Sequence, residues 1–475
     1  MEDRARAPSS SAARVDTKGA AGSSVHEPAS DIRVSAHADS GRRRWKLPSR
    51  FVAAALDSHS VIGLAFSALI YLICLTGTVS VLVDELKLLE QPYPAAIGLH
   101  PGALNGAVTA VLAREPLPAA LYAVAPTTPR QRLTLTVYGA SGEQSFISDA
   151  RGTVVSQQTP FADFVTHLHM TLTAPAPWGS LMVGIAGAAL LALLVSGVLA
   201  HPRIFRDAFR LRLNGSKRLQ EAELHNRLSV WGLPFHITVT LTGALFGLAN
   251  LAVLTVAGLG FHGNTGRVLA PLSGPDVVAD SRPMGLPDVE GLVRQVQAQL
   301  PGSHLDYVGI ERPGTRGTQV TVEVGTATRL PRGEDFHFDA EGHQIGRTGF
   351  LTGSTGLQVY SGAAQAHFGF FGGLPVRLAY VVLGAALTFV TATGFNIWLA
   401  RQAERGRPRT RLRSVWRAWT RGAPVALVTA ALLSHFMPAG WTFWTVVLMA
   451  QGIAFGWTNG FPAHIRASDR GDASP

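Results

Sequence analysis

Four histidines occupy matching places in the two halves of this sequence. His59 and His225 are each followed, after sixteen intervening residues, by a Thr-Gly pair inside an apolar segment. His169 and His367 precede a Ser-Gly and a Thr-Gly pair by 27 and 26 residues. Two imidazoles that face each other across a helix bundle can bind the iron of a haem from both sides. The repeated spacing therefore predicts haem iron bound by histidines, with enough ligands for two haem b groups.

Two further histidines are candidates for the same chemistry. His201 ends the second apolar segment, and His236 lies inside the third, where an ionisable side chain is costly and usually functional. His236 could replace His59 as a ligand, contact a haem propionate or relay a proton, and the sequence leaves these alternatives open. The Ser/Thr-Gly pairs are expected to allow close helix packing or to leave room beside a flat macrocycle.

Composition places the chain among membrane proteins. Hydrophobic residues make up 47% of the 475 residues and the mean hydropathy is +0.20, yet the net charge is +10. The basic residues stand beside apolar segments, which is typical of inner loops of membrane proteins and disfavours nucleic-acid binding. Cys74 is the one cysteine, which excludes an internal disulfide framework, a CxxC redox pair and a Cys-ligated iron–sulfur cluster within one chain.

Apolar segments predict an α-helical integral membrane protein with a four-helix core. About 20 apolar residues cross the hydrocarbon core of a bilayer. Four segments reach that length: Val61–Val83, Trp178–Ala200, Leu228–Asn250 and Leu374–Ala400. Two shorter segments, Pro424–Met437 and Trp441–Trp457, flank a Pro-Ala-Gly turn and predict a C-terminal membrane hairpin.

The basic residues orient these helices. Clusters of Arg and Lys at 42–50, 203–218 and 401–421 fall on one side of the membrane if the N-terminus is cytoplasmic. This is the distribution expected from the positive-inside rule. Residues 1–50 lack the apolar stretch of a signal peptide and are expected to be disordered. We therefore expect a multi-pass membrane protein with a cytoplasmic N-terminus.

The expected organisation alternates membrane helices with loops and two extra-cytoplasmic modules. In chain order the predicted parts are a cytoplasmic tail (1–50), helix one (51–84), module one (85–165), helix two (166–201), a basic loop (202–224), helix three (225–258), module two (259–365), helix four (366–400), a second basic loop (401–422), the hairpin (423–458) and a tail (459–475).

Both modules have an α+β pattern. Helical periodicity at Val289–Leu300 is followed by strand-like His304–Glu311, Gln319–Val324 and Asp335–Phe338. In the first module, a helix at Ala103–Arg114 would precede strands at Leu133–Tyr138 and Ser145–Ser148. The unit of helix, module and helix thus occurs twice, both times starting on the cytoplasmic side, which predicts a parallel duplication.

Duplication and orientation together place the histidines in two groups. His59 and His225 begin helices that run outward, so both should lie near the cytoplasmic face. His169 and His367 precede helices that run inward, so both should lie near the outer face. At 1.5 Å per residue, the sixteen-residue spacer separates the two levels by roughly 25 Å. The sequence therefore predicts one haem site near each face.

Several of these segments resemble a known family. The stretch Val195–Arg206, the segment Ala222–Asn226, and Leu233-Pro-Phe-His236 are similar to the PepSY-associated transmembrane family of iron-regulated membrane proteins. His59 with Leu75-Thr-Gly77 and His367 with Ala392-Thr-Gly394 match the first and fourth helices of that family, so the resemblance covers about residues 55–402. It implies that the two modules are PepSY-like domains.

The resemblance also implies a function. Members of this family include haem-containing ferric-siderophore reductases of the inner membrane, so the chain is expected to pass electrons to a periplasmic ferric siderophore or other ferric chelate. The sequence contains no P-loop, GxSxG, HExxH or dinucleotide fingerprint. Electrons would thus come from a cytoplasmic reductase or the quinone pool. Two alternatives are a non-enzymatic PepSY sensor and a permease for iron chelates.

Overall fold

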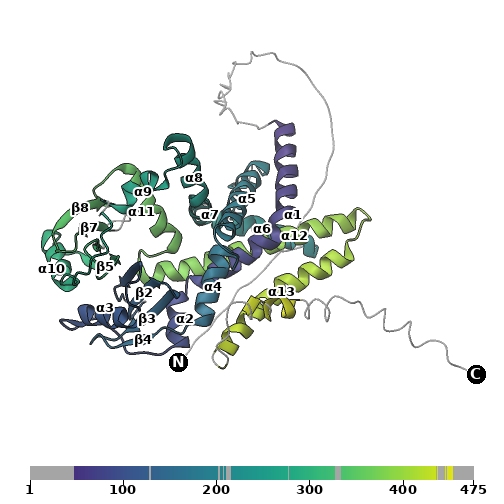
Figure 1. The fold of residues 1–475 in the computed structure, drawn as a ribbon. Coiled ribbons are helices and arrows are strands. Elements are labelled where there is room, and N and C mark those ends of the chain that lie inside the picture. Colours follow the sequence, from purple (N-terminus) through teal and green to yellow (C-terminus); the bar gives the residue numbers. More distant parts are fainter. Residues whose placement is uncertain are drawn as a thin grey trace, which may run out of the picture. The chain divides into compact units, whose positions relative to one another are not determined.

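Long apolar helices and one β-sheet make up the computed structural model of the protein (Figure 1). It describes residues 48–452 apart from 128–129, 202–203, 207, 210–214, 276–277, 327–332, 435, 437–443 and 446. The predicted C-terminal tail and nearly all of the predicted N-terminal tail lie outside the described residues.

Three helices are long and apolar enough to cross a membrane. They are α1 (Ser49–Ser80), α5 (Trp178–Ala200) and α12 (Gly373–Glu404). The shortest of them, α5, has 23 residues. At 1.5 Å per residue it extends about 35 Å, enough for a hydrocarbon core of about 30 Å. The chain is therefore a multi-pass membrane protein.

The third predicted span is broken rather than continuous. Helices α6 (Lys217–Trp231) and α7 (Leu233–Gly247) meet at an angle of 73°. Gly232 lies between them and Pro234 stands in the first turn of α7, where the missing N–H of proline costs no helical hydrogen bond. A short helix, α8 (Ala249–Gly260), follows α7. The segment Leu228–Asn250, predicted as one membrane helix, is thus divided among several helices, and His225 and His236 lie on different ones.

The membrane helices form one packed group. Helix α1 packs against α5 and α12, α5 packs against α7, and α6 packs against α12. Small residues bring α5 and α7 close together, because a Cβ atom on Gly247 would lie 2.6 Å from the backbone of Gly184. An apolar cluster of Ile70, Ala186, Leu190 and Leu387 fills the centre of the group.

The two predicted modules share a single antiparallel sheet. The first contributes α3 (Ala103–Arg114), β1 (Ala120–Val124), β2 (Leu133–Gly139), β3 (Gly142–Ser148) and β4 (Val154–Ser156). The second contributes α10 (Val289–Gln299), β5 (His304–Glu311), β6 (Gln319–Gly325), β7 (Glu334–Phe338) and β8 (Gln344–Gly349). The strand order is β4-β3-β2-β1-β5-β6-β7-β8, and β1 joins β5 in the middle.

Period-two alternation gives the sheet one apolar face. Leu121, Leu135, Val308 and Val322 point to that face and pack with α3 and α10 in one buried cluster. Glu290 of α10 links the two helices, because its carboxylate accepts hydrogen bonds of 2.7 and 2.8 Å from the backbone N–H groups of Gly102 and Leu104. Most predicted elements of the modules form, whereas β1, β4 and β8 are additional.

Shorter helices connect the sheet to the spans. They are α2 (Val83–Glu90), α4 (Pro160–Thr171), α9 (Thr265–Ser273) and α11 (Thr355–Phe368). Glu90 of α2 caps α4 by accepting hydrogen bonds from the N–H groups of Phe161 and Ala162. Beside the spans lies α13 (Thr410–Ser434), which includes much of the predicted second basic loop and most of the first hairpin segment. Much of the second hairpin segment lies outside the described residues.

Candidate functional site

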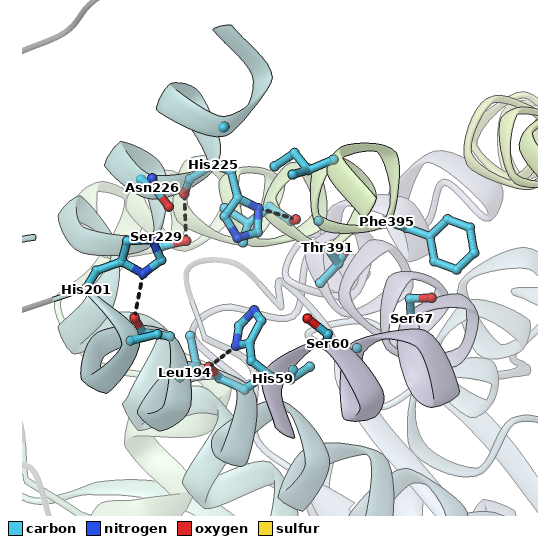
Figure 2. Close-up of a pocket in the computed structure, with 18 of the residues that line it drawn as sticks. His59, Ser60, Ser67, Leu194, His201, His225, Asn226, Ser229, Thr391 and Phe395 are labelled. Atoms are coloured by element: carbon cyan, nitrogen blue, oxygen red, sulfur yellow. Dashed lines mark hydrogen bonds between the residues drawn. The ribbon is translucent and has the colours of Figure 1, made fainter. Parts of the chain in front are cut away.

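Two pockets among the helices contain the predicted histidines. We call the first pocket the space lined by His59 of α1, His225 of α6 and residues of α5 and α12. The second pocket is lined by His169 of α4, His367 of α11 and residues of α1, α5, α7 and α12. Figure 2 shows the imidazoles of His59 and His225 facing each other across the first pocket, with His201 to one side. The structure therefore groups the four histidines as His59 with His225 and His169 with His367.

In the first pocket each ligand candidate is held by its Nδ1 atom. His59 Nδ1 lies 3.0 Å from the carbonyl oxygen of Leu193 and 3.1 Å from the hydroxyl of Ser196. His225 Nδ1 lies 3.0 Å from the carbonyl oxygen of Val390 and 3.1 Å from the hydroxyl of Thr393. A carbonyl oxygen can only accept, so Nδ1 carries the proton and Nε2 keeps its lone pair.

The second pocket repeats the arrangement. His169 Nδ1 donates to the carbonyl oxygen of Ile73 at 3.0 Å. His367 Nδ1 lies 2.9 Å from the hydroxyl of Thr242 and also bonds the carbonyl of Val239. The Thr242 hydroxyl gives its own proton to the Thr238 carbonyl, so its oxygen accepts from the imidazole. All four histidines therefore adopt the same tautomer.

The glycine after each hydroxyl residue makes room for an imidazole ring. A Cβ atom would lie 3.3 Å from His59 Cε1 at Gly197 and 3.3 Å from His225 Cε1 at Gly394. The contact would be closer in the second pocket, at 2.6 Å from His169 Cε1 for Gly77 and 3.0 Å from His367 Cε1 for Gly243. Each glycine thus gives the ring a flat surface, and in three of the four pairs, those of Ser196, Thr242 and Thr393, the hydroxyl also lies within hydrogen-bond distance of the imidazole.

The motif works between helices rather than along one helix. His59 does not meet the Thr76-Gly77 pair that follows it, but the Ser196-Gly197 pair of α5. The Thr76-Gly77 pair instead receives His169. His59 also lies inside α1, ten residues after its first residue Ser49, and not at its start as the apolar segment suggested. The spacing between a histidine and the Thr-Gly pair of its own helix thus reflects their different depths along the helix. Each histidine contacts the Ser/Thr-Gly pair of a neighbouring helix instead.

The ring spacing in the second pocket fits a haem iron between its two histidines. The ring centres of His169 and His367 are 6.4 Å apart and their planes differ by 17°. A metal ion about 2 Å from each of two imidazole nitrogens separates the ring centres by roughly 6 Å. Among the described residues, none of the four Nε2 atoms has a hydrogen-bond partner. In the same part of the chain no three His, Cys, Asp or Glu side chains group as ligands of a bare metal ion.

The other two predicted histidines are placed differently. His201 is exposed at the edge of the first pocket, where its Nδ1 lies 3.2 Å from the carbonyl oxygen of Gly197 one turn earlier. His236 is fully buried and lines neither pocket. Its Nε2 atom, and not Nδ1, faces a carbonyl, that of Leu383 at 3.4 Å. His236 therefore has the opposite tautomer to the four pocket histidines.

Sequence reasoning missed the residues between the pockets. Leu190 of α5 and Leu387 of α12 line both pockets. Each stands six residues before its Ser/Thr-Gly pair. That equal spacing was a signal in the sequence, but leucines inside apolar helices are too common to attract attention. The hydroxyls of Ser196, Thr393 and Thr242 were noticed only as small residues for helix packing, because their partners belong to other helices.

Comparisons with known proteins identify a family for the chain. The family described as the PepSY-associated TM region matches residues 56–401 of the chain. An uncharacterized protein of Pseudomonas aeruginosa is 28% identical over 286 residues, which are 58% of this chain and 71% of that protein. The family match includes both pockets and all four pocket histidines, and it ends before α13 begins.

Proposed function

The chain belongs to the PepSY-associated TM family, and on this premise we propose that it is a haem b protein that reduces a periplasmic ferric chelate. One observation carries the proposal. Four imidazoles from four different helices each have Nδ1 held by a neighbouring helix, which leaves the Nε2 lone pair for a metal. This hydrogen bond from Nδ1 fixes the ring and increases the basicity of the ligand nitrogen.

Each pocket holds one haem in this proposal. His59 and His225 are the ligands in the first pocket, and His169 and His367 in the second. Haem b, when bound, supplies a reversible one-electron site. The hydrogen bonds at Nδ1 hold both imidazole planes in fixed orientations, and most side chains around the space between them are apolar. These are the conditions under which a ligand pair keeps its geometry in both oxidation states.

The shared wall of the pockets supports electron transfer between them. Leu190 and Leu387 line both, so a single layer of side chains separates the two spaces. An estimate from helix depth alone separates the histidine levels by about 25 Å, which is long for one electron step. Because the two pockets extend toward each other and meet at one layer of side chains, groups bound in them would be closer together than the histidine levels are.

The orientation and the duplication belong to the same proposal. Arg401, Arg405, Arg407 and Arg409 follow α12, and we place them in the cytoplasm together with the N-terminus by the positive-inside rule. The sheet then lies on the periplasmic side, and the first pocket is nearer to a cytoplasmic or quinone donor. Equal motif spacing, matched strand order and four equivalent histidine contacts support a duplicated unit.

Reduction would release iron from its carrier. One electron converts Fe(III) in the chelate to Fe(II). Hard oxygen donors prefer Fe(III), so the reduced ion is held less firmly and can be taken up as a divalent cation. The chelate would bind on the side of the second pocket, since that pocket is nearer to the sheet in the proposed orientation.

Oxidation of the reduced protein by a ferric siderophore tests the proposed function. The purified full-length chain is reduced with dithionite, freed of reductant and mixed with the chelate, while the haem spectrum and Fe(II) capture by ferrozine are followed. We expect one Fe(II) for each electron lost by the protein. A reduced protein that ferricyanide oxidises and ferric siderophores do not would instead support the sensor alternative.

A further inference from the structure

Four helices around the two pockets share an equivalent position, and the residue at one of these positions is polar. Four residues stand six positions before the hydroxyl residue of a Ser/Thr-Gly pair: Ile70 on α1, Leu190 on α5, His236 on α7 and Leu387 on α12. The three apolar residues belong to one buried cluster. We call these four residues the septum. His236 occupies the place on α7 that Ile70 occupies on α1, so the polar group is an asymmetry between the two halves of the chain.

His236 presents a hydrogen-bond acceptor that the protein does not use. Its Nε2 atom faces the Leu383 carbonyl at 3.4 Å and must carry the proton there, because a carbonyl oxygen can only accept. Nδ1 is then a bare lone pair. The side chain is 0% exposed, and Nδ1 has no hydrogen-bond partner among the described residues. A buried acceptor of this kind is unfavourable unless a donor reaches it.

A second unused polar atom lies one helical turn further on. The hydroxyl of Thr240 is buried and, within the described part of the chain, has no partner. The threonines on either side, Thr238 and Thr242, donate to the carbonyls four residues earlier in the usual way. Residues four apart share one face of a helix. His236 and Thr240 therefore present two unsatisfied polar atoms, Nδ1 and Oγ1, on one face of α7, and Thr240 lines the second pocket.

We propose that this pair binds one ordered water molecule inside the membrane, between the two pockets. The water donates one hydrogen to His236 Nδ1 and shares a hydrogen bond with the Thr240 hydroxyl. Both atoms are then satisfied, and a polar site of this kind is what a buried water requires. The site needs no haem in order to form, because both binding groups are side chains of α7.

The role of this water rests on the proposed function. Dipoles beside a buried redox centre stabilise its more highly charged state, and the oxidised form of a bis-histidine haem carries the extra positive charge. The septum water lies at the wall of the second pocket. It therefore lowers the midpoint potential there more than in the first pocket, and so limits the difference in potential between the two sites.

The repeat itself supplies the test variant. His236→Ile with Thr240→Cys gives α7 the residues that α1 has at the equivalent positions, Ile70 and Cys74. The fold already accommodates these side chains in its other half. Thr240→Val removes only the hydroxyl, and Thr238→Val, whose hydroxyl is satisfied by the Pro234 carbonyl, is the matched control.

Infrared spectra of the full-length chain in lipid nanodiscs detect the water directly. Exchange into H₂¹⁸O should shift a weakly hydrogen-bonded O–H band in the wild type and in T238V, and this band should be lost in the double variant and reduced in T240V. The midpoint potential of the second site should rise in the double variant. Persistence of the band in the double variant would overturn the proposal.

Two other outcomes are decisive. Loss of one haem equivalent in the double variant, with haem content retained in T240V, would show that His236 is a ligand, which contradicts a water-binding role. A wild-type protein that binds no haem but keeps the ¹⁸O-sensitive band would refute the proposed function and retain the water site. The two proposals can therefore fail separately.

Discussion

The two pockets use the same contacts to orient their histidines but surround them with different side chains. In each, Nδ1 bonds a carbonyl of a neighbouring helix and the ring lies against a glycine. The first pocket also contains polar and charged residues: Ser60, His201, Asn226, Ser229 and Arg401. The second pocket has more aromatic residues, Phe235, Phe246, Phe368 and Tyr380, whereas the first has Phe395 and Trp398.

This difference indicates that the orientation of the histidines and the redox potential of a bound metal centre are set by different parts of each pocket. The backbone carbonyls set the geometry, and they are equivalent in both pockets. The surroundings set the local polarity, which controls the potential of a bound metal centre. An aromatic wall disfavours the charged oxidised state, so the second site should have the higher potential. Electrons would then flow from the first pocket to the second, in the outward direction that the proposed function requires.

Removing one ligand from each pocket should have the largest effect. His225→Ala and His367→Ala should each reduce the haem content from about two per chain to about one, because the remaining imidazole has no partner across the pocket. The pyridine haemochrome assay on purified protein measures the ratio. His201→Ala is the control and should keep both haems. Unchanged content in H225A or H367A would break the ligand assignment for that pocket.

Glycine-to-alanine substitutions should affect haem content differently in the two pockets, because the space beside the histidine ring differs. Gly77→Ala places a methyl group where the nearest histidine atom is 2.6 Å away, so the ring of His169 must move. Gly197→Ala and Gly394→Ala meet their rings at 3.3 Å, which a small shift can relieve. We expect G77A to lose most of the second haem and the two first-pocket variants to retain theirs. Equal losses in all three would show that these glycines serve general helix packing.

Some features of the two pockets could be predicted from the sequence, and others could not. Apolar length and basic loops predicted the multi-pass architecture, and the matched spacings selected the four histidines. Which helix holds which ring could not be predicted, because His59 is held by α5 and not by the Thr-Gly of its own helix. The bend at Gly232 was hidden in a continuous apolar segment, and the pairing of β1 with β5 depends on contacts between strands distant in the sequence.

The hydroxyl groups should have smaller effects than the glycines. Thr393→Val and Thr242→Val each remove one acceptor from Nδ1 while the backbone carbonyl remains. Second-shell changes typically alter metal affinity by about 10- to 100-fold, and the retained carbonyl should keep the loss near or below the lower value. Haem titration of the apo-protein measures it. A loss comparable to that in H225A or H367A would mean that the hydroxyl, and not the carbonyl, fixes the ring.

Helix α13 should influence the first pocket alone, and weakly. Trp416 donates from Nε1 to the Ala392 carbonyl at 3.2 Å and stacks on Phe395, which lines that pocket. Trp419 makes a similar bond to the Ala68 carbonyl of α1. Trp416→Phe should shift the low-spin electron paramagnetic resonance signal of the first site and leave the second unchanged. Trp419→Phe is the matched control, and an equal shift in both variants would indicate a general effect of α13 packing.

A change in the sheet should affect neither pocket. Burial and the nearby carboxylates of Glu334 and Asp306 raise the pKa of Asp335 to about 7. Between about pH 4 and pH 7 the unfolded state ionises while the native state stays protonated, so stability falls as pH rises by up to roughly 4 kcal/mol. Asp335→Asn should remove this slope in thermal unfolding followed by circular dichroism, with the haem ratio unchanged. An unchanged slope would assign the pH dependence to other groups.

The haem content and spin state of the wild-type protein test the central claim most directly. The full-length chain, expressed with ample haem and purified in nanodiscs, should contain two haem b per chain. It should show a reducible Soret band and two low-spin ferric signals typical of bis-histidine ligation. A colourless protein, or one whose haem is high-spin with an open axial position, would contradict the assignment of two histidine-ligated sites.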